Sequence, residues 1–227
     1  MLVGALTRLE LPSFEVIVAD DGSTDGTREY LTDLAAQDPR FRTLFHDGKQ
    51  TTLRAQAVAI SDARGELVVV MDADLQHPVE RLPAMVEAAN AGADLVVASR
   101  YAPGGSVGPR TLGRWAISRG AEWLAKLRLP EARVTSDPMS GFFLFRRAIY
   151  RPLDPSYRGY KLLLFLLVMA GGRRVRDVPY QFQPRREGAS KMLQDRSFLR
   201  LFLREIRLAR ALRKSLRAAD RRARSQS

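Results

Sequence analysis

The sequence predicts an α/β fold in which a mostly parallel sheet is flanked by helices. Two observations lead to this prediction. Short apolar segments alternate with helical segments every ~25–30 residues, which is typical of βαβ units. Acidic pairs also follow two of the apolar segments directly, at Asp20–Asp21 and Asp72–Asp74. Because ligands of parallel sheets bind beyond the carboxyl ends of the strands, these pairs are the first indication of a functional site.

Each expected element in the first half of the chain has a local signal. Short apolar runs predict buried strands, which are expected at residues 14–19, 41–45, 67–71 and 95–98. Helices are expected after Asp25 to about residue 37, then at 51–63 and 78–90. Ser23–Asp25 offers capping side chains for the first helix, Gly65 ends the second, and Pro78 suits the first turn of the third.

The second half is less regular. Gly and Pro residues predict a loop at 101–110, and polar and charged residues predict another at 184–191. Strands are expected at 141–145 and 174–180, and helices at 111–127, 160–170 and 197–217. This pattern divides the chain into a main domain, residues 1–192, and a helical tail, residues 193–227.

Composition narrows the class of protein. The 227 residues include 45% hydrophobic residues, enough for a globular core, and no cysteine, which excludes disulfides and thiolate metal sites. The longest apolar run, residues 162–170, is about half of the ~18–20 residues that a membrane span needs. The formal net charge is +12, and the chain from Arg196 onward holds eleven Lys and Arg against two acidic residues. Such a tail suits an anionic surface.

The segment that follows residues 67–71 has the strongest chemical signal. Asp72 and Asp74 flank one small residue, and Gln76 adds an amide oxygen. Two carboxylates at this spacing can hold one hard divalent cation, Mg²⁺ or Mn²⁺, which keeps substrate phosphates and water as its remaining ligands. His77 is expected to be a hydrogen-bonding neighbour rather than a ligand. Asp20 and Asp21 are expected to bind a nucleobase or ribose.

Five motifs occur in a fixed order. They are Asp-Asp-Gly-Ser-Thr-Asp-Gly-Thr from Asp20, Asp-Ala-Asp-Leu-Gln-His-Pro from Asp72, Ser-Arg-Tyr from Ser99, Asp-Pro-Met-Ser-Gly-Phe-Phe from Asp137 and Gly-Ala-Ser-Lys from Gly188. The set resembles the dolichyl-phosphate (polyprenyl-phosphate) mannosyltransferases of the inverting glycosyltransferase family 2, over about residues 14–192. The resemblance implies a GT-A, Rossmann-like catalytic domain.

The resemblance also implies roles for individual residues. It assigns the metal and the donor diphosphate to Asp72, Asp74 and Gln76, and the nucleotide to Asp20 and Asp21. Phosphate contacts fall to Arg100, Arg114 and Ser118, and a loop that closes over the site holds Arg185, Ser190 and Lys191. The residues expected to carry the transfer itself are Asp74, Arg100, Arg185 and Lys191.

The implied reaction moves a hexose, mannose from GDP-mannose, to a polyprenyl phosphate. No carboxylate base is expected in the helix 160–170, because an acceptor phosphate is already anionic and needs positioning more than deprotonation. The alternatives are a UDP-sugar donor, a non-catalytic scaffold that partners a longer relative, and a nucleic-acid-binding protein. The last has only the high pI in its favour, and no nucleic-acid partner is expected. The family's opening strand is missing from the start of the sequence.

The tail is expected to be an amphipathic helix. One face holds Arg196, Arg200, Arg204 and Arg207, and the opposite face holds Phe198, Leu199, Phe202, Leu203 and Ile206. This pattern suits a helix that lies in a bilayer interface, and the alternative is a helix packed on the domain with a solvated basic face. The sequence thus predicts a peripheral protein on the cytoplasmic side of an anionic membrane, with a membrane-anchoring partner possible.

Overall fold

The computed structural model of the protein describes residues 2–6, 13–46, 51–108, 112–154, 156–157, 159–183 and 198–225. The strands are β1 (Val16–Asp20), β2 (Phe41–Phe45), β3 (Leu67–Val70), β4 (Leu95–Ser99), β5 (Phe143–Arg146) and β6 (Val175–Pro179). The α-helices are α1 (Leu2–Leu6), α2 (Thr27–Gln37), α3 (Thr52–Asp62), α4 (Leu82–Asn90), α5 (Leu112–Arg128), α6 (Leu162–Met169) and α7 (Phe198–Arg224). The described residues also form short 3₁₀ helices at η1 (Val79–Arg81), η2 (Pro130–Val134) and η3 (Arg147–Ile149). Within these residues, every helix is too short or too polar to cross a bilayer.

The strands form two sheets rather than the single sheet expected. β1 pairs in parallel with β2, and the second sheet has the order β3-β5-β4-β6. In the second sheet β4 and β6 are parallel, whereas β5 runs antiparallel to both of its neighbours. The reversal follows from where β5 starts: the Ser140 hydroxyl donates to the carbonyl of Ala98, so the chain enters β5 beside the end of β4 and must run back. The α/β class is confirmed, with β5 as the antiparallel exception.

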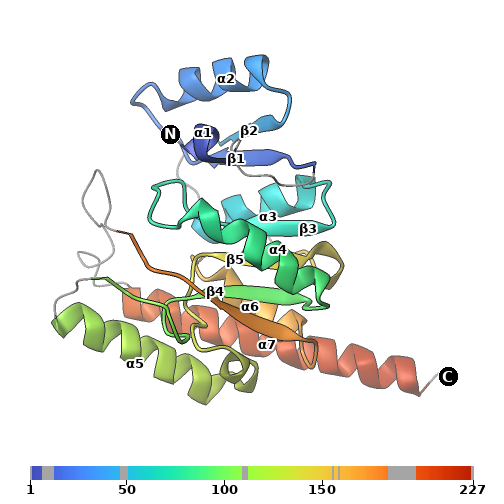
Figure 1. Ribbon diagram of the computed structural model, residues 1–227. Helices are drawn as coiled ribbons and strands as arrows, with labels where there is room; N and C mark the ends of the chain where they lie inside the picture. The colour runs from blue at the N-terminus through green and yellow to red at the C-terminus, as the bar shows by residue number, and fades with distance from the viewer. Residues whose placement is uncertain are drawn as a thin grey trace.

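Helices cover both faces of the four-stranded sheet (Figure 1). β4 is buried along its whole length, and its side chains alternate between two cores. Val96 and Ala98 pack in the core under α4, while Leu95 and Val97 pack in the core that α6 and α7 share. Such burial on both faces explains why β4 is apolar from Leu95 to Ala98. The carboxyl end of β4 is thereby fixed in place, and the next residue is Arg100.

α7 lies on the body of the protein. Phe202, Ile206 and Ala209 are buried in the core beside α6. The prediction that this face enters a bilayer is therefore wrong for Phe202 and Ile206, and the alternative of a packed helix is what the structure shows. Arg204 and Arg207 are exposed on the opposite face as expected, whereas Arg196 and the side chain of Phe198 lie outside the described residues.

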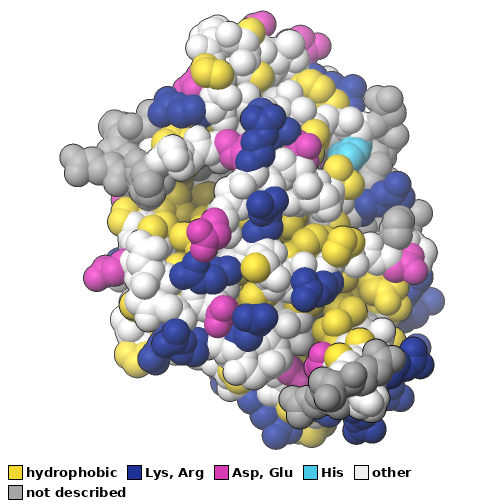
Figure 2. All heavy atoms as spheres, turned by 90° about the vertical axis from the view of Figure 1, so that its right-hand side faces the viewer, with side chains coloured by type: hydrophobic (Ala, Val, Ile, Leu, Met, Phe, Trp, Pro, Cys, Tyr) yellow, Lys and Arg dark blue, Asp and Glu magenta, His cyan; other side chains and the backbone are white. Residues whose placement is uncertain are grey.

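Figure 2 shows the face that carries the C-terminus. Lys and Arg side chains are spread over it and gather along its lower margin, where α7 ends in Figure 1. The basic charge expected of the tail thus reaches solvent, whereas on the apolar face of the same helix Phe202 and Ile206 are buried and Leu199 is exposed.

Candidate active site at the ends of β3 and β4

The acidic turn begins just after β3. Asp72 is exposed and Asp74 is partly buried. The backbone N–H of Gln76 donates to Oδ1 of Asp74 at 3.1 Å, and its side-chain amide donates to the carbonyl of Gln183 at 3.2 Å. Leu75 has a φ of 61°, a left-handed conformation that branched and bulky residues rarely adopt. The turn is therefore held in a strained shape by its own hydrogen bonds, and strain of this kind gathers at functional sites.

His77 is hydrogen-bonded to this turn. It is buried, stacks on Phe142 with ring centroids 5.3 Å apart, and accepts the backbone N–H of Asp72 on Nδ1 at 3.1 Å. Burial lowers the pKa of His77, although the charges of Asp72 and Asp74 act in the opposite direction. The ring is thus neutral at physiological pH, with Nδ1 as its acceptor nitrogen. The prediction of a hydrogen-bonding neighbour is confirmed.

A glycine lets the 137–142 loop approach the same turn. A Cβ added to Gly141 would lie 3.3 Å from Cε1 of His77 and 3.4 Å from Oδ2 of Asp72. The next two residues, Phe142 and Phe143, are almost fully buried, as expected of core aromatics. The turn and the loop together form one acidic corner of the site.

The donors at this corner suit a hard divalent cation. Carboxylate oxygens of Asp72 and Asp74, with the amide of Gln76 beside them, are the oxygen ligands that Mg²⁺ and Mn²⁺ take. The described residues include no group of three or more His, Cys, Asp or Glu that could hold a metal by itself. A cation here would therefore take its other ligands from substrate and water, which is how Mg²⁺ usually binds phosphates.

The acidic pair after β1 divides into two environments. Asp20 is buried and accepts hydrogen bonds from the backbone and hydroxyl of Ser23 and from Nε of Arg28 at 3.2 Å. Burial tends to raise the pKa of Asp20, but these partners outweigh burial and lower it. Asp21 is exposed. Asp20 thus closes the turn, and Asp21 is the one of the pair that faces solvent.

The capping prediction for α2 holds for Asp25 only, and the N-cap position itself falls on a residue that was not expected there. Gly26 occupies the N-cap position without a side-chain hydrogen bond. Ser23 instead binds Asp20, whereas Asp25 accepts both the backbone N–H and the hydroxyl of Thr27, the first residue of α2, at 3.3 and 2.6 Å. Ser23 therefore shapes the loop after β1, and Asp25 satisfies an N–H group at the start of the helix.

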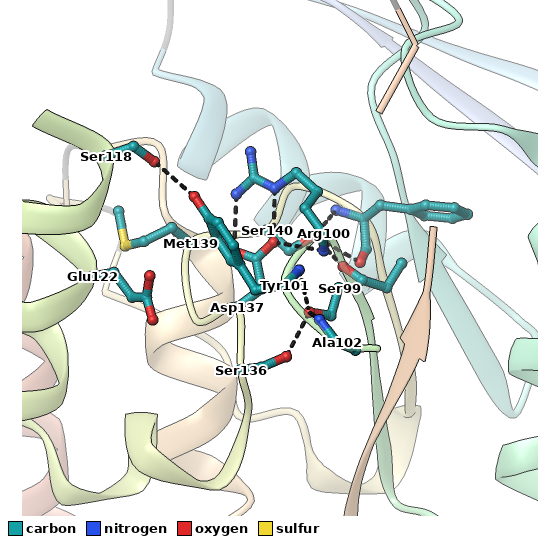
Figure 3. Close-up of polar contacts among 12 residues, drawn as sticks. Ser99, Arg100, Tyr101, Ala102, Ser118, Glu122, Ser136, Asp137, Met139 and Ser140 are labelled. Atoms are coloured by element: carbon teal, nitrogen blue, oxygen red, sulfur yellow. Dashed lines mark hydrogen bonds and ion pairs between the residues drawn. The ribbon is translucent and has the colours of Figure 1, made fainter. Parts of the chain in front are cut away.

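Arg100 is anchored by Asp137 at the end of β4 (Figure 3). Its backbone N–H, Nε and Nη2 donate to the Asp137 carboxylate at 3.2, 2.7 and 2.8 Å. Asp137 is 0% exposed and the Arg100 side chain 11%. Burial alone would lower the pKa of Arg100, but the hydrogen bonds and charge of Asp137 outweigh it and raise that pKa, so the guanidinium stays charged. The pair fixes the guanidinium plane, and Nη1 is the nitrogen that Asp137 does not use.

Ser118 reaches this region from α5. Figure 3 shows its hydroxyl pointing toward Tyr101, and the two oxygens are 3.3 Å apart. Tyr101 directly follows Arg100, and its ring centroid lies 5.6 Å from Cζ of Arg100, so both Arg100 and Ser118 contact this tyrosine. The phosphate role that the resemblance implied for Ser118 stays a prediction. Arg114 lies on the same helix, but its side chain is not described. Arg185, Ser190 and Lys191 lie outside the described residues.

Lys161 is a residue near the site that the sequence reading did not single out. Its Nζ donates to the carbonyl of Met139 at 3.2 Å, in the loop that adjoins Asp72. A signal was present: a lone lysine immediately precedes the most apolar run of the chain, residues 162–170. The sequence could not show that this lysine begins a helix whose start lies beside the site.

Comparison with known proteins gives one family. The sequence profile described as "Glycosyl transferase family 2" matches residues 2–153. A dolichol-phosphate mannosyltransferase of Pyrococcus furiosus is 34% identical over 180 residues, which are 79% of this chain and 51% of that protein. One of Mycosarcoma maydis is 35% identical over 188 residues, 81% of this chain and 63% of that protein. The chain thus spans about half to two thirds of the length of these relatives.

The fold likeness extends to solved structures. Glucosyl-3-phosphoglycerate synthase of Mycobacterium tuberculosis, in complex with Mn²⁺, UDP and glucosyl-3-phosphoglycerate, matches with a TM-score of 0.60 at 22% identity. The match covers 83% of this chain and 67% of that one, and at this identity it shows the fold alone. The profile match covers more than half of the sequence, and the chain therefore belongs to glycosyl transferase family 2.

Proposed function

We propose that this protein transfers mannose from GDP-mannose to a polyprenyl (dolichyl) phosphate at a membrane surface. The observation that carries the proposal is the strained acidic turn of Asp72 and Asp74, supported by His77 and adjoining the anchored Arg100. The mannosyltransferases to which the chain is similar support the choice of donor sugar and of lipid acceptor. GDP as the nucleotide comes from the resemblance.

The proposed role of each site residue follows from its charge. Asp72, Asp74 and Gln76 would hold Mg²⁺ or Mn²⁺, whose positive charge stabilises a departing nucleoside diphosphate. Nη1 of Arg100 and the hydroxyl of Ser118 are proposed to bind and orient phosphate, together with Arg114. Arg185, Ser190 and Lys191 are proposed to close over the donor, and Asp21 to bind the nucleotide next to the turn that Asp20 closes.

The acceptor oxygen needs alignment rather than a base. A phosphate monoester is anionic at neutral pH, and α6 contains no acidic residue that could take a proton. One in-line displacement at the anomeric carbon then forms the new bond as the bond to the diphosphate breaks, and it inverts the configuration. The rate enhancement rests on orientation and on fixed charges at the site.

Product analysis tests the proposal. The full chain is incubated with GDP-mannose, Mg²⁺ or Mn²⁺ and a short polyprenyl phosphate, and the lipid product is identified by mass spectrometry. Asp74→Asn should lower kcat/KM by at least about 100-fold, whereas Asp33→Asn, an exposed carboxylate on α2, should leave it unchanged. Full activity in Asp74→Asn would remove the metal role. Because the solved structural neighbour binds UDP, UDP-glucose is the alternative donor, and turnover with it alone would change the substrate assignment.

Membrane docking is proposed to use α5 as well as α7. Trp115, Trp123 and Leu127 are 51%, 67% and 49% exposed on α5, and Arg119 and Lys126 lie on the same helix. α5 packs beside α7, the helix that carries the exposed arginines (Figure 1). Trp suits the membrane–water interface and basic residues suit anionic lipid. The surface would place the protein on the cytoplasmic side, where a membrane-anchoring partner could also bind.

Co-sedimentation with phosphatidylserine vesicles tests the docking surface. Trp123→Ser should reduce the bound fraction severalfold because it removes the most exposed aromatic side chain of α5. Tyr30→Ser is the matched control, since Tyr30 is an exposed aromatic on α2, and it should bind as the wild type does. Equal binding by both variants would contradict the assignment to α5.

A further inference from the structure

Glu205 links α7 to the start of α6. Its side chain is 0% exposed, and Oε1 accepts the backbone N–H groups of Lys161 at 2.7 Å and Tyr160 at 2.5 Å. Lys161 is the N-cap residue of α6 and supplies no side-chain cap of its own. A carboxylate from another helix thus satisfies N–H groups at a helix N-terminus, where negative charge is favourable.

The contact is close enough to require a glycine. A Cβ added to Gly159 would lie 2.1 Å from Oε1 of Glu205. The carbonyl of Gly159 accepts the N–H of Leu53, at the beginning of α3, at 3.0 Å. The segment from Gly159 to Lys161 is therefore fixed between α7 and α3, and the position of the lysine side chain depends on both helices.

The ammonium group of Lys161 lies at the base of the site. Nζ donates to the carbonyl of Met139, and the loop continues to Gly141, which faces Asp72. Burial lowers the pKa of Lys161, and the charge of Arg100 acts in the same direction, whereas the charges of Glu205, Asp137 and Asp72 act to raise it. An ammonium has three hydrogens to donate, and among the described residues Met139 is the one hydrogen-bond acceptor of Nζ, which also lies 5.5 Å from the centroid of the Tyr160 ring. Its capacity for an anion is therefore largely unused.

The charge balance of the site favours a role for this lysine. Arg100 is compensated by Asp137 in a buried pair, whereas Lys161 has no carboxylate within 4 Å among the described residues. Lys161 thus has no ion-pair partner in direct contact among the described residues, although the carboxylates of Glu205, Asp137 and Asp72 act on it at longer range. A phosphate group, with several charged acceptor oxygens, matches a point charge of this kind.

We infer that Lys161 is a further anion-binding residue of this site, contacting a substrate phosphate, and that Glu205 is the residue that positions it. The inference rests on the proposed function for the identity of the phosphates, a nucleoside diphosphate or a lipid phosphate. It makes α7 a structural part of the site, through a residue on its buried face.

Calorimetric titration of the full chain tests the inference without requiring turnover. The probes are GDP with Mg²⁺ and, separately, farnesyl phosphate. Lys161→Met should weaken binding of at least one probe about 10-fold, while Arg64→Met, at an exposed cation just after α3, should not weaken either. Equal affinities of Lys161→Met and the wild type for both probes would overturn the inference.

A double-mutant cycle tests the positioning role. Glu205→Ala should weaken the same probe to a similar extent, and Glu205→Ala combined with Lys161→Met should add little to either single change. Glu205→Gln keeps an acceptor for the two N–H groups and should restore binding, which also covers the case in which Glu205→Ala does not fold. Glu131→Ala removes a different carboxylate partner of α7, that of Arg213, and should leave the probe affinities unchanged.

The outcomes separate this inference from the proposed function. Additive losses in the cycle, or no rescue by Glu205→Gln, would overturn the role of Glu205. Weaker phosphate binding by Lys161→Met in a chain that transfers no mannose would support the lysine and refute the transferase assignment. Failure of the wild type to bind either probe would refute both.

Discussion

Replacing Asp137 with alanine should leave the Arg100 guanidinium buried without its counterion. Three hydrogen bonds join the two residues, and neither side chain is more than 11% exposed. Removing one partner of such a pair typically costs about 3–5 kcal/mol, because the remaining charge is left uncompensated. For a chain of this size the corresponding fall in Tm is roughly 6–20 °C.

The chain contains a matched control for this prediction. Arg40 donates to Asp38 through the same three groups, its backbone N–H, Nε and Nη2, but the pair lies at the surface. Because water screens an exposed pair, Asp38→Ala should not shift the unfolding midpoint measurably. The measurement is urea unfolding followed by circular dichroism at 222 nm, with a thermal scan of each variant.

The result that would refute the reasoning is a loss below about 1 kcal/mol for Asp137→Ala, which is what an exposed pair would give. An equal loss in Asp38→Ala would refute it as well, because burial would then not be the cause. Combining Arg100→Met with Asp137→Leu should recover much of the stability, since replacing both partners of a buried pair is often neutral. The same double variant should still lose phosphate binding, because Arg100 is proposed to supply Nη1.

Three further predictions concern α7 and its contacts. Phe202→Ala should lower the free energy of unfolding in urea by about 3–5 kcal/mol, because it removes a buried ring. Arg204→Gln changes an exposed residue of the same helix and should alter that free energy by no more than about 0.5 kcal/mol. Equal effects of the two changes would place the apolar face outside the core. Gly159→Ala should lower the Tm, because its Cβ would overlap Glu205, and a wild-type Tm would contradict that contact. Burial raises the pKa of Glu205 above its usual 4.5, although two backbone N–H groups and a nearby ammonium act to lower it. The unfolded chain therefore loses the Glu205 proton at a lower pH than the folded protein does. The stability that this group contributes is full below pH 4.5 and is lost as pH rises through the folded pKa. Glu205→Gln should therefore gain stability relative to the wild type from pH 4.5 upward, by at most about 1.4 kcal/mol per pH unit, and a difference that is constant with pH would contradict the raised pKa.

The sequence predicted the elements that have a strong local signal. The apolar strands β3 and β4, the acidic turn after β3 and the supporting role of His77 all follow from residues that are adjacent in the chain. The antiparallel direction of β5 does not, because it depends on a contact between Ser140 and Ala98 that are 42 residues apart. Apolar runs indicate a strand but not its direction.

Contacts between residues that are distant in the sequence also explain which features of the site were not predicted. Asp137 begins one of the five sequence motifs, yet its partner Arg100 lies 37 residues away in the chain. Glu205 looks like a solvated charge on a basic helix, because helical periodicity shows which residues share a face but not what covers that face. Its position between Phe202 and Ile206 is unusual only once that face is known to be buried.

The burial of α7 changes what the tail can do. An amphipathic helix can place its apolar residues in a bilayer or in its own core, and the two arrangements have the same sequence pattern. Here Phe202 and Ile206 complete the core beside α6, and Glu205 between them fixes the start of that helix. Removing α7 should therefore unfold part of the domain and displace Lys161, instead of simply releasing an intact protein from vesicles. The membrane docking that we propose would then use the exposed basic face of α7 and α5, which carries Ser118 on one side and Trp123 in solvent. A single helix would thus contact both the lipid surface and the phosphate site, as an acceptor embedded in the bilayer requires.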